Sequence, residues 1–182
     1  MSTLLLTVLV IAACGAVWYI STMNRFARLL VKIREADSGI EVALTKRFDT
    51  LSKLLDVTRA YAKHEADTLS GIVQLRNGMS MAERTAANVK MDELAGRINV
   101  MAEAYPELRS SENFRELQAA ITEAEEHLQA ARRIYNMNVS AFNQLLVSWP
   151  ASIVGHILHH TAREFFAAEE HKKQDVNMEF QS

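Results

Sequence analysis

Three histidines near the C-terminal end have the spacing closest to that of a chemical site. His156 and His160 are four positions apart, so on one helix their imidazoles share a face and can bind one metal ion. Glu164 lies one turn further and would supply a third ligand. Zinc metalloproteases use H-E-x-x-H, however, and His156 is followed by Ile157. Three interpretations of these residues and His159 stay open. They could form a metal or small-molecule sensor site, they could make a pH-sensitive contact, or they could be solvent-facing or bundle-end side chains without a ligand.

His64 and Glu65 form a second pair, in the interior of a long predicted helix. A catalytic role would need a nucleophile nearby, and the single cysteine, Cys14, lies in an apolar segment. We interpret the pair as a buried hydrogen bond or helix–helix contact. The sequence has no glycine-rich phosphate loop, CxxC pair or G-x-S-x-G motif. We therefore expect no enzymatic activity, no cofactor and no resident metal.

The composition predicts an all-α protein. The chain has 182 residues, of which only two are proline and six are glycine, the residues that interrupt helices. Hydrophobic residues make up 49% of the chain, enough to build a core. The net charge is -2 and the two signs are interspersed, which disfavours a nucleic-acid partner.

Residues 1–24 contain no charged side chain, and residues 3–20 are almost continuously apolar. A helix of that length rises about 27 Å, close to the ~30 Å hydrocarbon core of a bilayer. Trp18 and Tyr19 lie near its end, where amphipathic rings favour the membrane interface. The segment is predicted to be a retained transmembrane anchor that contacts the lipid bilayer.

Two alternatives remain for this segment. Residues 11–15 resemble a lipobox, in which Cys14 would be acylated and become the new N-terminus. An ordinary cleaved signal peptide is the other alternative. Both normally begin with positive charges, which are missing here, and the apolar run continues beyond Cys14 to Ile20. These features favour the retained anchor.

The basic residues predict how the anchor is oriented. Lysine and arginine are absent before the span and frequent just after it. The positive-inside tendency therefore places the N-terminus outside and the following domain in the cytoplasm, at the inner (plasma) membrane. Lipidation at Cys14 would reverse this topology. The basic residues after the span are Arg25, Arg28, Lys32 and Arg34.

Beyond the anchor we expect an antiparallel bundle of about four long helices. Ser80 and Glu83 form an S-x-x-E start signal, and Pro106 ends the preceding helical run. Ser38-Gly39 predicts a bend or restart within the first helix. The predicted helices cover residues 26–75, 80–105, 110–149 and 152–168, in a bundle domain of residues 25–168 followed by a flexible polar tail at 169–182.

The third predicted helix carries a heptad pattern typical of helical bundles. Apolar and small residues recur at alternating steps of three and four and predict one buried face. Asn136 and Asn143 are seven positions apart on one side, where polar groups can set helix register by hydrogen bonding or bind a ligand. The patterned positions are Phe114, Leu117, Ile121, Ala124, Leu128, Ala131 and Tyr135, extended by Val139, Phe142 and Leu146.

Three ordered blocks resemble the LemA family of bacterial membrane proteins. They are LTKRFDTLSKLLDVTRAYAKHE at residues 44–65, AEAYPELRSSENFRELQ at 102–118 and EAEEHLQAARRIYNMNVSAFN at 123–143. The resemblance implies a helical bundle beyond one membrane span and no established enzymatic activity. The three histidines replace that family's usual glycine-rich aromatic stretch. The positions that match the family's motifs, which we expect to be structural, are Arg47, Tyr61, His64, Glu65, Tyr105, Pro106, Asn113, Phe114, Tyr135, Asn136, Asn143, Phe165 and Phe166.

The functional prediction is a membrane-anchored scaffold or interaction protein of the bacterial cell envelope. Its bundle would dock unidentified protein partners through an exposed helix face, with a homo-oligomer as one form of that docking. The alternative is a membrane-tethered metal or small-molecule sensor that uses the region of His156 and His160.

Overall fold

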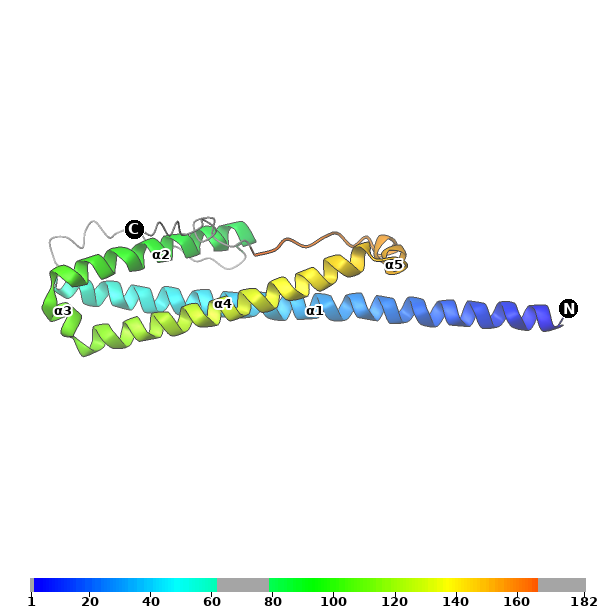
Figure 1. Ribbon diagram of the computed structural model, residues 1–182, viewed down its shortest axis with the longest axis horizontal. Helices are drawn as coiled ribbons and strands as arrows, with labels where there is room; N and C mark the ends of the chain where they lie inside the picture. Colours follow the sequence, from blue (N-terminus) through cyan, green and yellow to red (C-terminus); the bar gives the residue numbers. More distant parts are fainter. Residues whose placement is uncertain (1, 62–78, 167–182) are drawn as a thin grey trace, which may run out of the picture. The chain divides into compact units, whose positions relative to one another are not determined.

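The computed structural model describes residues 2–61 and 79–166 of the chain (Figure 1). This part of the chain contains helices and no strand, so the predicted all-α class is confirmed. The helices are α1 (Ser2–Tyr61), α2 (Met81–Ala104), α3 (Pro106–Ser110), α4 (Glu112–Val147) and α5 (Ala151–Ile157).

The chain forms two compact units. The first unit contains the described residues up to Ser38 together with residues 133–165. The second unit contains the described residues between Gly39 and Arg132 together with Phe166. Both α1 and α4 contribute residues to each unit.

The first helix is continuous through Ser38-Gly39, so the predicted restart is wrong, and the predicted bend stays a prediction. An interior glycine costs a helix about 1 kcal/mol relative to alanine, which is a weak signal beside tertiary packing. Ala36 and Ile40, on either side of the dipeptide, are both buried. A Cβ on Gly39 would lie 3.9 Å from the Cβ of Ala131, so a small residue suits this position. The predicted end of this helix near residue 75 lies outside the described residues.

The second helix begins with the predicted capping box. The backbone amide of Ser80 donates to Glu83 Oε2 over 2.7 Å, and the amide of Glu83 donates to Ser80 Oγ over 3.3 Å. The predicted stop before Pro106 is also confirmed. Pro106 then starts the short helix α3, where its fixed φ suits the first helical position. This helix was not expected from the sequence.

One hydrophobic cluster of the second unit draws one or two buried residues from each of four helices. Leu54 of α1, Ile98 of α2, Leu108 of α3 and Phe114 of α4 pack in one cluster, and all are at most 1% exposed. Figure 1 shows α2 running beside α1 and α4 in this unit. The short helix α3 is stabilised by its buried residue Leu108, which packs in this cluster.

The heptad pattern of α4 is confirmed as its buried face. Ala124 and Leu128 are fully buried in the second unit, and Val139 and Phe142 are fully buried in the first. The pattern shifts at its end, because Leu145 is buried where Leu146 was expected. The helix ends at Val147, just before the predicted stop at Trp149-Pro150.

The last predicted helix is much shorter than expected. It covers Ala151–Ile157 instead of residues 152–168. His159 has a φ of 51°, in the left-handed region that does not continue a right-handed helix. The following residues up to Phe166 are not helical, and side chains of α4 hydrogen-bond their backbone.

Candidate functional site

The N-terminal third of α1 is an apolar helix without an intrachain partner. Every residue from Ser2 to Trp18 is exposed, and the first buried residues are Thr22 and Phe26. An 18-residue window of this helix has a mean hydropathy of 2.3 with none of it buried. Among the described residues it is the one helix long and apolar enough to cross a membrane. Its free cysteine, Cys14, is exposed within this stretch.

In the first unit, Asn143 and Tyr135 hold the segment that follows α5. Asn143 Nδ2 donates to the carbonyl of Arg163 over 2.9 Å, and Asn143 Oδ1 accepts from the Arg163 amide over 2.8 Å. Tyr135 Oη donates to the carbonyl of Glu164 over 3.1 Å. These bonds satisfy backbone groups that a longer α5 would have paired internally. Two of the predicted family-motif positions, Tyr135 and Asn143, thus hydrogen-bond the backbone of this segment.

An aromatic cluster lies beside this polar contact. The His160 ring centroid is 5.0 Å from that of Phe26 and 5.6 Å from that of Phe142. The two phenylalanine rings meet edge to face at 5.6 Å. Gly155 packs closely here, since an added Cβ would lie 2.7 Å from Leu146 Cδ1 and 3.3 Å from Phe26 Cζ. His160 therefore serves as a packing side chain.

The helical arrangement assumed for a histidine metal site is not formed. His156 is exposed on α5, whereas His159 and His160 lie beyond its end, so the two outer histidines do not share a helical face. Glu164 enters the hydrogen bonding through its backbone carbonyl. In the part of the chain that the structure describes, no group of three or more His, Cys, Asp or Glu residues is placed to hold a metal ion.

The second unit contains a buried ionic cluster centred on Arg47, which we call the Arg47 cluster. The guanidinium of Arg47 donates to Asn88 Oδ1 and to Asp92 Oδ1 on α2. It also lies 3.0 Å from Glu125 Oε2 on α4. The Arg47 side chain is only 4% exposed, so these partners neutralise a charge that would be costly to bury alone.

This cluster links three helices through one side chain. The planar guanidinium offers several donors in a fixed geometry, which suits simultaneous contact with α2 and α4. The arrangement can fix helix register. Sequence reasoning singled out Arg47 but missed its partners. The only signal was the four-residue spacing of Asn88 and Asp92, which puts both on one face of α2.

A second ionic group lies at the surface of this unit. Lys46 Nζ donates to Glu123 Oε1 over 2.8 Å, and His127 Nε2 lies 3.4 Å from the same oxygen. The hydrogen bond and charge of Lys46, with a smaller effect of His127, hold the pKa of the Glu123 carboxyl below its usual value of 4.5. Solvent screens this exposed pair, so it contributes little to stability.

The remaining family-motif positions are scattered. Phe166 is buried, and the Arg132 guanidinium lies 4.5 Å from the centre of its ring, a cation–π distance. Phe165, its neighbour, is exposed. Phe114 is a core residue and Asn113 is exposed.

Five further positions belong to this set. Tyr105 and Asn136 are half-buried, whereas Tyr61 is exposed. His64 and Glu65 lie outside the described residues. Of the motif positions, Arg47 lies in the ionic cluster of the second unit, whereas Tyr135 and Asn143 hydrogen-bond backbone in the first.

These features define an all-α protein whose bundle continues from one exposed apolar N-terminal helix. The sequence matches the profile of the LemA family over residues 36–180, and the chain belongs to the LemA family. It is 28% identical over 164 residues to Protein LemA of Metamycoplasma hominis, a match that covers 87% of this chain and 75% of that relative. The LemA family is not known as an enzyme family.

Proposed function

We propose that this chain is a membrane-anchored helical scaffold of the bacterial cell envelope that docks protein partners. The observation that carries the proposal is the exposed apolar helix of residues 2–20, of which no residue is buried. An apolar surface of this size on a soluble monomer is rare and marks a membrane or protein contact. Its length of about 27 Å fits the hydrocarbon core of a bilayer.

The proposed orientation rests on the basic residues that follow the span. Arg25, Arg28 and Arg34 are exposed on α1. The positive-inside tendency places them, and the bundle beyond them, in the cytoplasm, with the N-terminus outside. Acylation of Cys14 is the competing possibility and would reverse this arrangement.

The scaffold role rests on the kind of contacts that the bundle contains. The Arg47 cluster joins α1, α2 and α4 through buried polar contacts, and such contacts favour one helix register over others. A bundle with a defined register presents the same surface to a partner each time. The partners are unidentified proteins, and a second copy of the chain is included among them.

The topology test combines two measurements on intact spheroplasts. A C-terminal tag is exposed to protease, and the intact mass of the purified chain is measured. A protected tag with an unacylated, retained N-terminus is the expected result. Digestion of the tag together with a lipid on Cys14 would establish an envelope lipoprotein and overturn the proposed topology.

The docking test is cross-linking in intact cells followed by recovery of the tagged full chain from detergent. The matched control is a tagged single-span protein of similar abundance. We expect one set of partners, or a defined oligomer, that the control does not recover. A chain that stays monomeric and recovers nothing beyond the control in repeated experiments overturns the scaffold proposal.

A further inference from the structure

A group of large apolar side chains is exposed around the turn between α4 and α5. Val147 is 79% exposed and Trp149 is 83% exposed, although tryptophan is usually well covered in a folded chain. Ile153 and Ile157, on α5 itself, are also exposed. We call these four residues the turn patch. All four belong to the first unit, and no described residue covers them.

The surrounding sequence lacks formal charge over a long stretch. No Asp, Glu, Lys or Arg occurs between Arg133 and Arg163, whereas such residues make up 23% of the chain. A stretch of that length at the average frequency would contain about six or seven of them. Charged side chains normally keep exposed helix surfaces in water. Their absence indicates that this surface meets a less aqueous environment.

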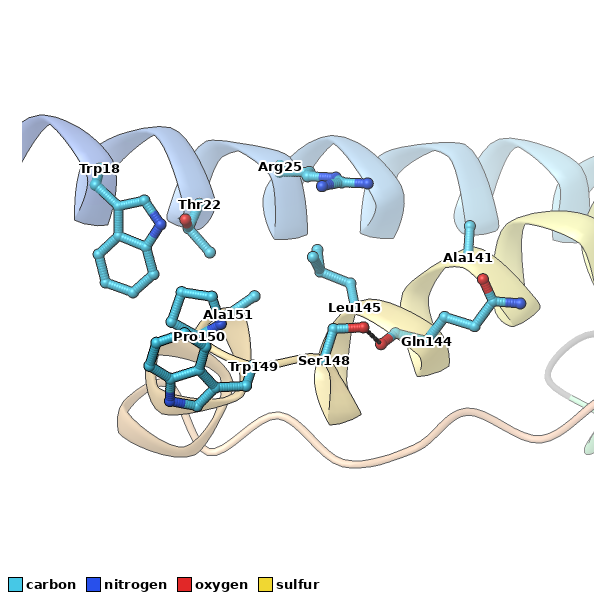
Figure 2. Close-up of a pocket in the computed structure, with 10 residues that line it drawn as sticks. All are labelled: Trp18, Thr22, Arg25, Ala141, Gln144, Leu145, Ser148, Trp149, Pro150 and Ala151. Carbon is cyan, nitrogen blue, oxygen red and sulfur yellow. Dashed lines mark hydrogen bonds between the residues drawn. The ribbon is translucent and has the colours of Figure 1, made fainter.

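The turn patch is level with the end of the apolar helix. Trp149 and Pro150 line the same hollow as Trp18, Thr22 and Arg25 of α1 (Figure 2). Figure 2 shows Trp18 on the side of α1 that faces Pro150. Since the apolar run ends near Ile20, this is the height at which an inserted α1 leaves the hydrocarbon core.

We propose that the turn patch inserts into the interfacial layer of the bilayer beside α1, as a second membrane contact. This inference rests on the proposed membrane anchoring of residues 2–20. The occupant is lipid at the boundary between headgroups and acyl chains. Seven residues of α5 are too few to cross a membrane, so the contact is interfacial.

Three observations favour lipid over a protein partner. The turn patch adjoins the span, so anchoring α1 brings it to the bilayer in any case. Tryptophan is enriched at the headgroup level, where both Trp18 and Trp149 would lie. Arg25 in the hollow and the exposed Arg28 one turn further are placed to meet anionic headgroups.

The chain contains two tryptophans, so each can be observed alone. The Trp18→Phe variant leaves Trp149, and the Trp149→Phe variant leaves Trp18. Both full-length variants are reconstituted in phosphatidylcholine–phosphatidylglycerol vesicles with lipids brominated in the upper acyl chain. We expect tryptophan emission of both variants to be quenched at least twofold, because bromine quenches only at contact range.

The outcomes separate the inference from the proposed function. Quenching of Trp18 without quenching of Trp149 leaves the anchor in place and overturns the second contact. If neither Trp18 nor Trp149 is quenched, both the proposed anchor and the second membrane contact are overturned. A blue-shifted but unquenched Trp149 means that protein covers the turn patch, and this result also overturns the proposal.

A matched pair of charge substitutions gives a second readout. Ile153 and Ile134 are 49% and 50% exposed, but Ile134 lies about 20 Å along α4 from the turn, beyond the interfacial layer. In the Trp18→Phe background, Ile153→Glu is expected to halve the quenching of Trp149. Ile134→Glu is expected to leave it unchanged. Equal effects of the two substitutions, or no effect of either, overturn the lipid contact.

Discussion

The side-chain amide of Asn143 pairs with the backbone of Arg163 through two hydrogen bonds. The amide nitrogen of Asn143 donates to the Arg163 carbonyl over 2.9 Å, and its amide oxygen accepts from the Arg163 backbone N–H over 2.8 Å. Two residues paired on neighbouring antiparallel strands exchange hydrogen bonds in the same way. The contact joins α4 to a segment twenty positions later that is not helical. An asparagine of the heptad-patterned helix thus pairs with the backbone of a non-helical segment.

Asn143→Ala tests this contact directly. Each of its two hydrogen bonds is expected to contribute about 0.5–1.5 kcal/mol, so the first unit should lose about 1–3 kcal/mol of stability. The measurement is hydrogen exchange at the Arg163 amide in the detergent-solubilised full chain. Loss of protection at this amide is the expected result.

Two variants control for general effects of substitution on α4. Asn143→Asp keeps an acceptor for the Arg163 amide and should retain part of its protection. Asn138→Ala removes a single long bond, 3.4 Å to the carbonyl of Lys32, and should leave Arg163 protected. If Arg163 stays protected in Asn143→Ala, the pairing does not hold this segment.

Arg47→Met removes the centre of a buried ionic cluster. Asp92 and Glu125 would keep their charges without a partner, and breaking a buried pair in this way typically costs about 3–5 kcal/mol. Both acids retain some solvent contact, so we expect about 3 kcal/mol. Urea unfolding of the full chain in detergent, followed by far-UV circular dichroism, gives the change in unfolding free energy.

The adjacent Lys46→Met variant provides the comparison. Its ion pair with Glu123 is exposed and screened by solvent, so its loss should destabilise the chain much less than the loss of Arg47. Equal destabilisation by the two substitutions would show that the Arg47 cluster does not stabilise the second unit more than a surface pair does.

Alanine substitutions at Gly155 and Gly96 are expected to change the stability in opposite directions. At Gly155 the added methyl would meet Leu146 and the buried Phe26, which is expected to cost about 1–2 kcal/mol. At Gly96, inside α2, nothing lies within 4 Å of an added Cβ. There alanine should stabilise by up to about 1 kcal/mol through helix propensity. Thermal unfolding of the two variants checks the sign, and a stabilising Gly155→Ala would contradict the close packing.

The ion pair between Lys46 and Glu123 predicts how the pKa of the Glu123 carboxyl responds to substitution. Lys46 lowers the folded-state pKa of Glu123 below 4.5, so Lys46→Met should raise it. His127→Gln should raise it less, since His127 is the smaller cause. A depressed pKa contributes stability that is present above the unfolded pKa and disappears as the pH falls through the folded pKa. Carboxyl carbon chemical shifts followed between pH 2 and 7 measure it, and an unchanged pKa in Lys46→Met would exclude Lys46 as the cause.

Local signals predicted the features that depend on neighbouring residues. The capping box at Ser80, the stop before Pro106 and the buried face of α4 follow from short-range geometry and periodicity, and each is confirmed. The predicted restart at Ser38-Gly39 is wrong, because burial of Ala36 and Ile40 outweighs a small cost in helix propensity. The helical pairing of His156 and His160 failed with the early end of α5.

The sequence by itself determined the all-α class, the family and the apolar N-terminal helix, because composition and periodicity are properties of consecutive residues. Only the tertiary structure decided which residues meet. The partners of Arg47 lie 41 to 78 positions away along the chain, and Arg163 lies twenty positions from Asn143. Such contacts depend on how helices pack, and no local pattern encodes them. The same packing brings Trp149 level with Trp18, which places the turn patch beside the proposed span.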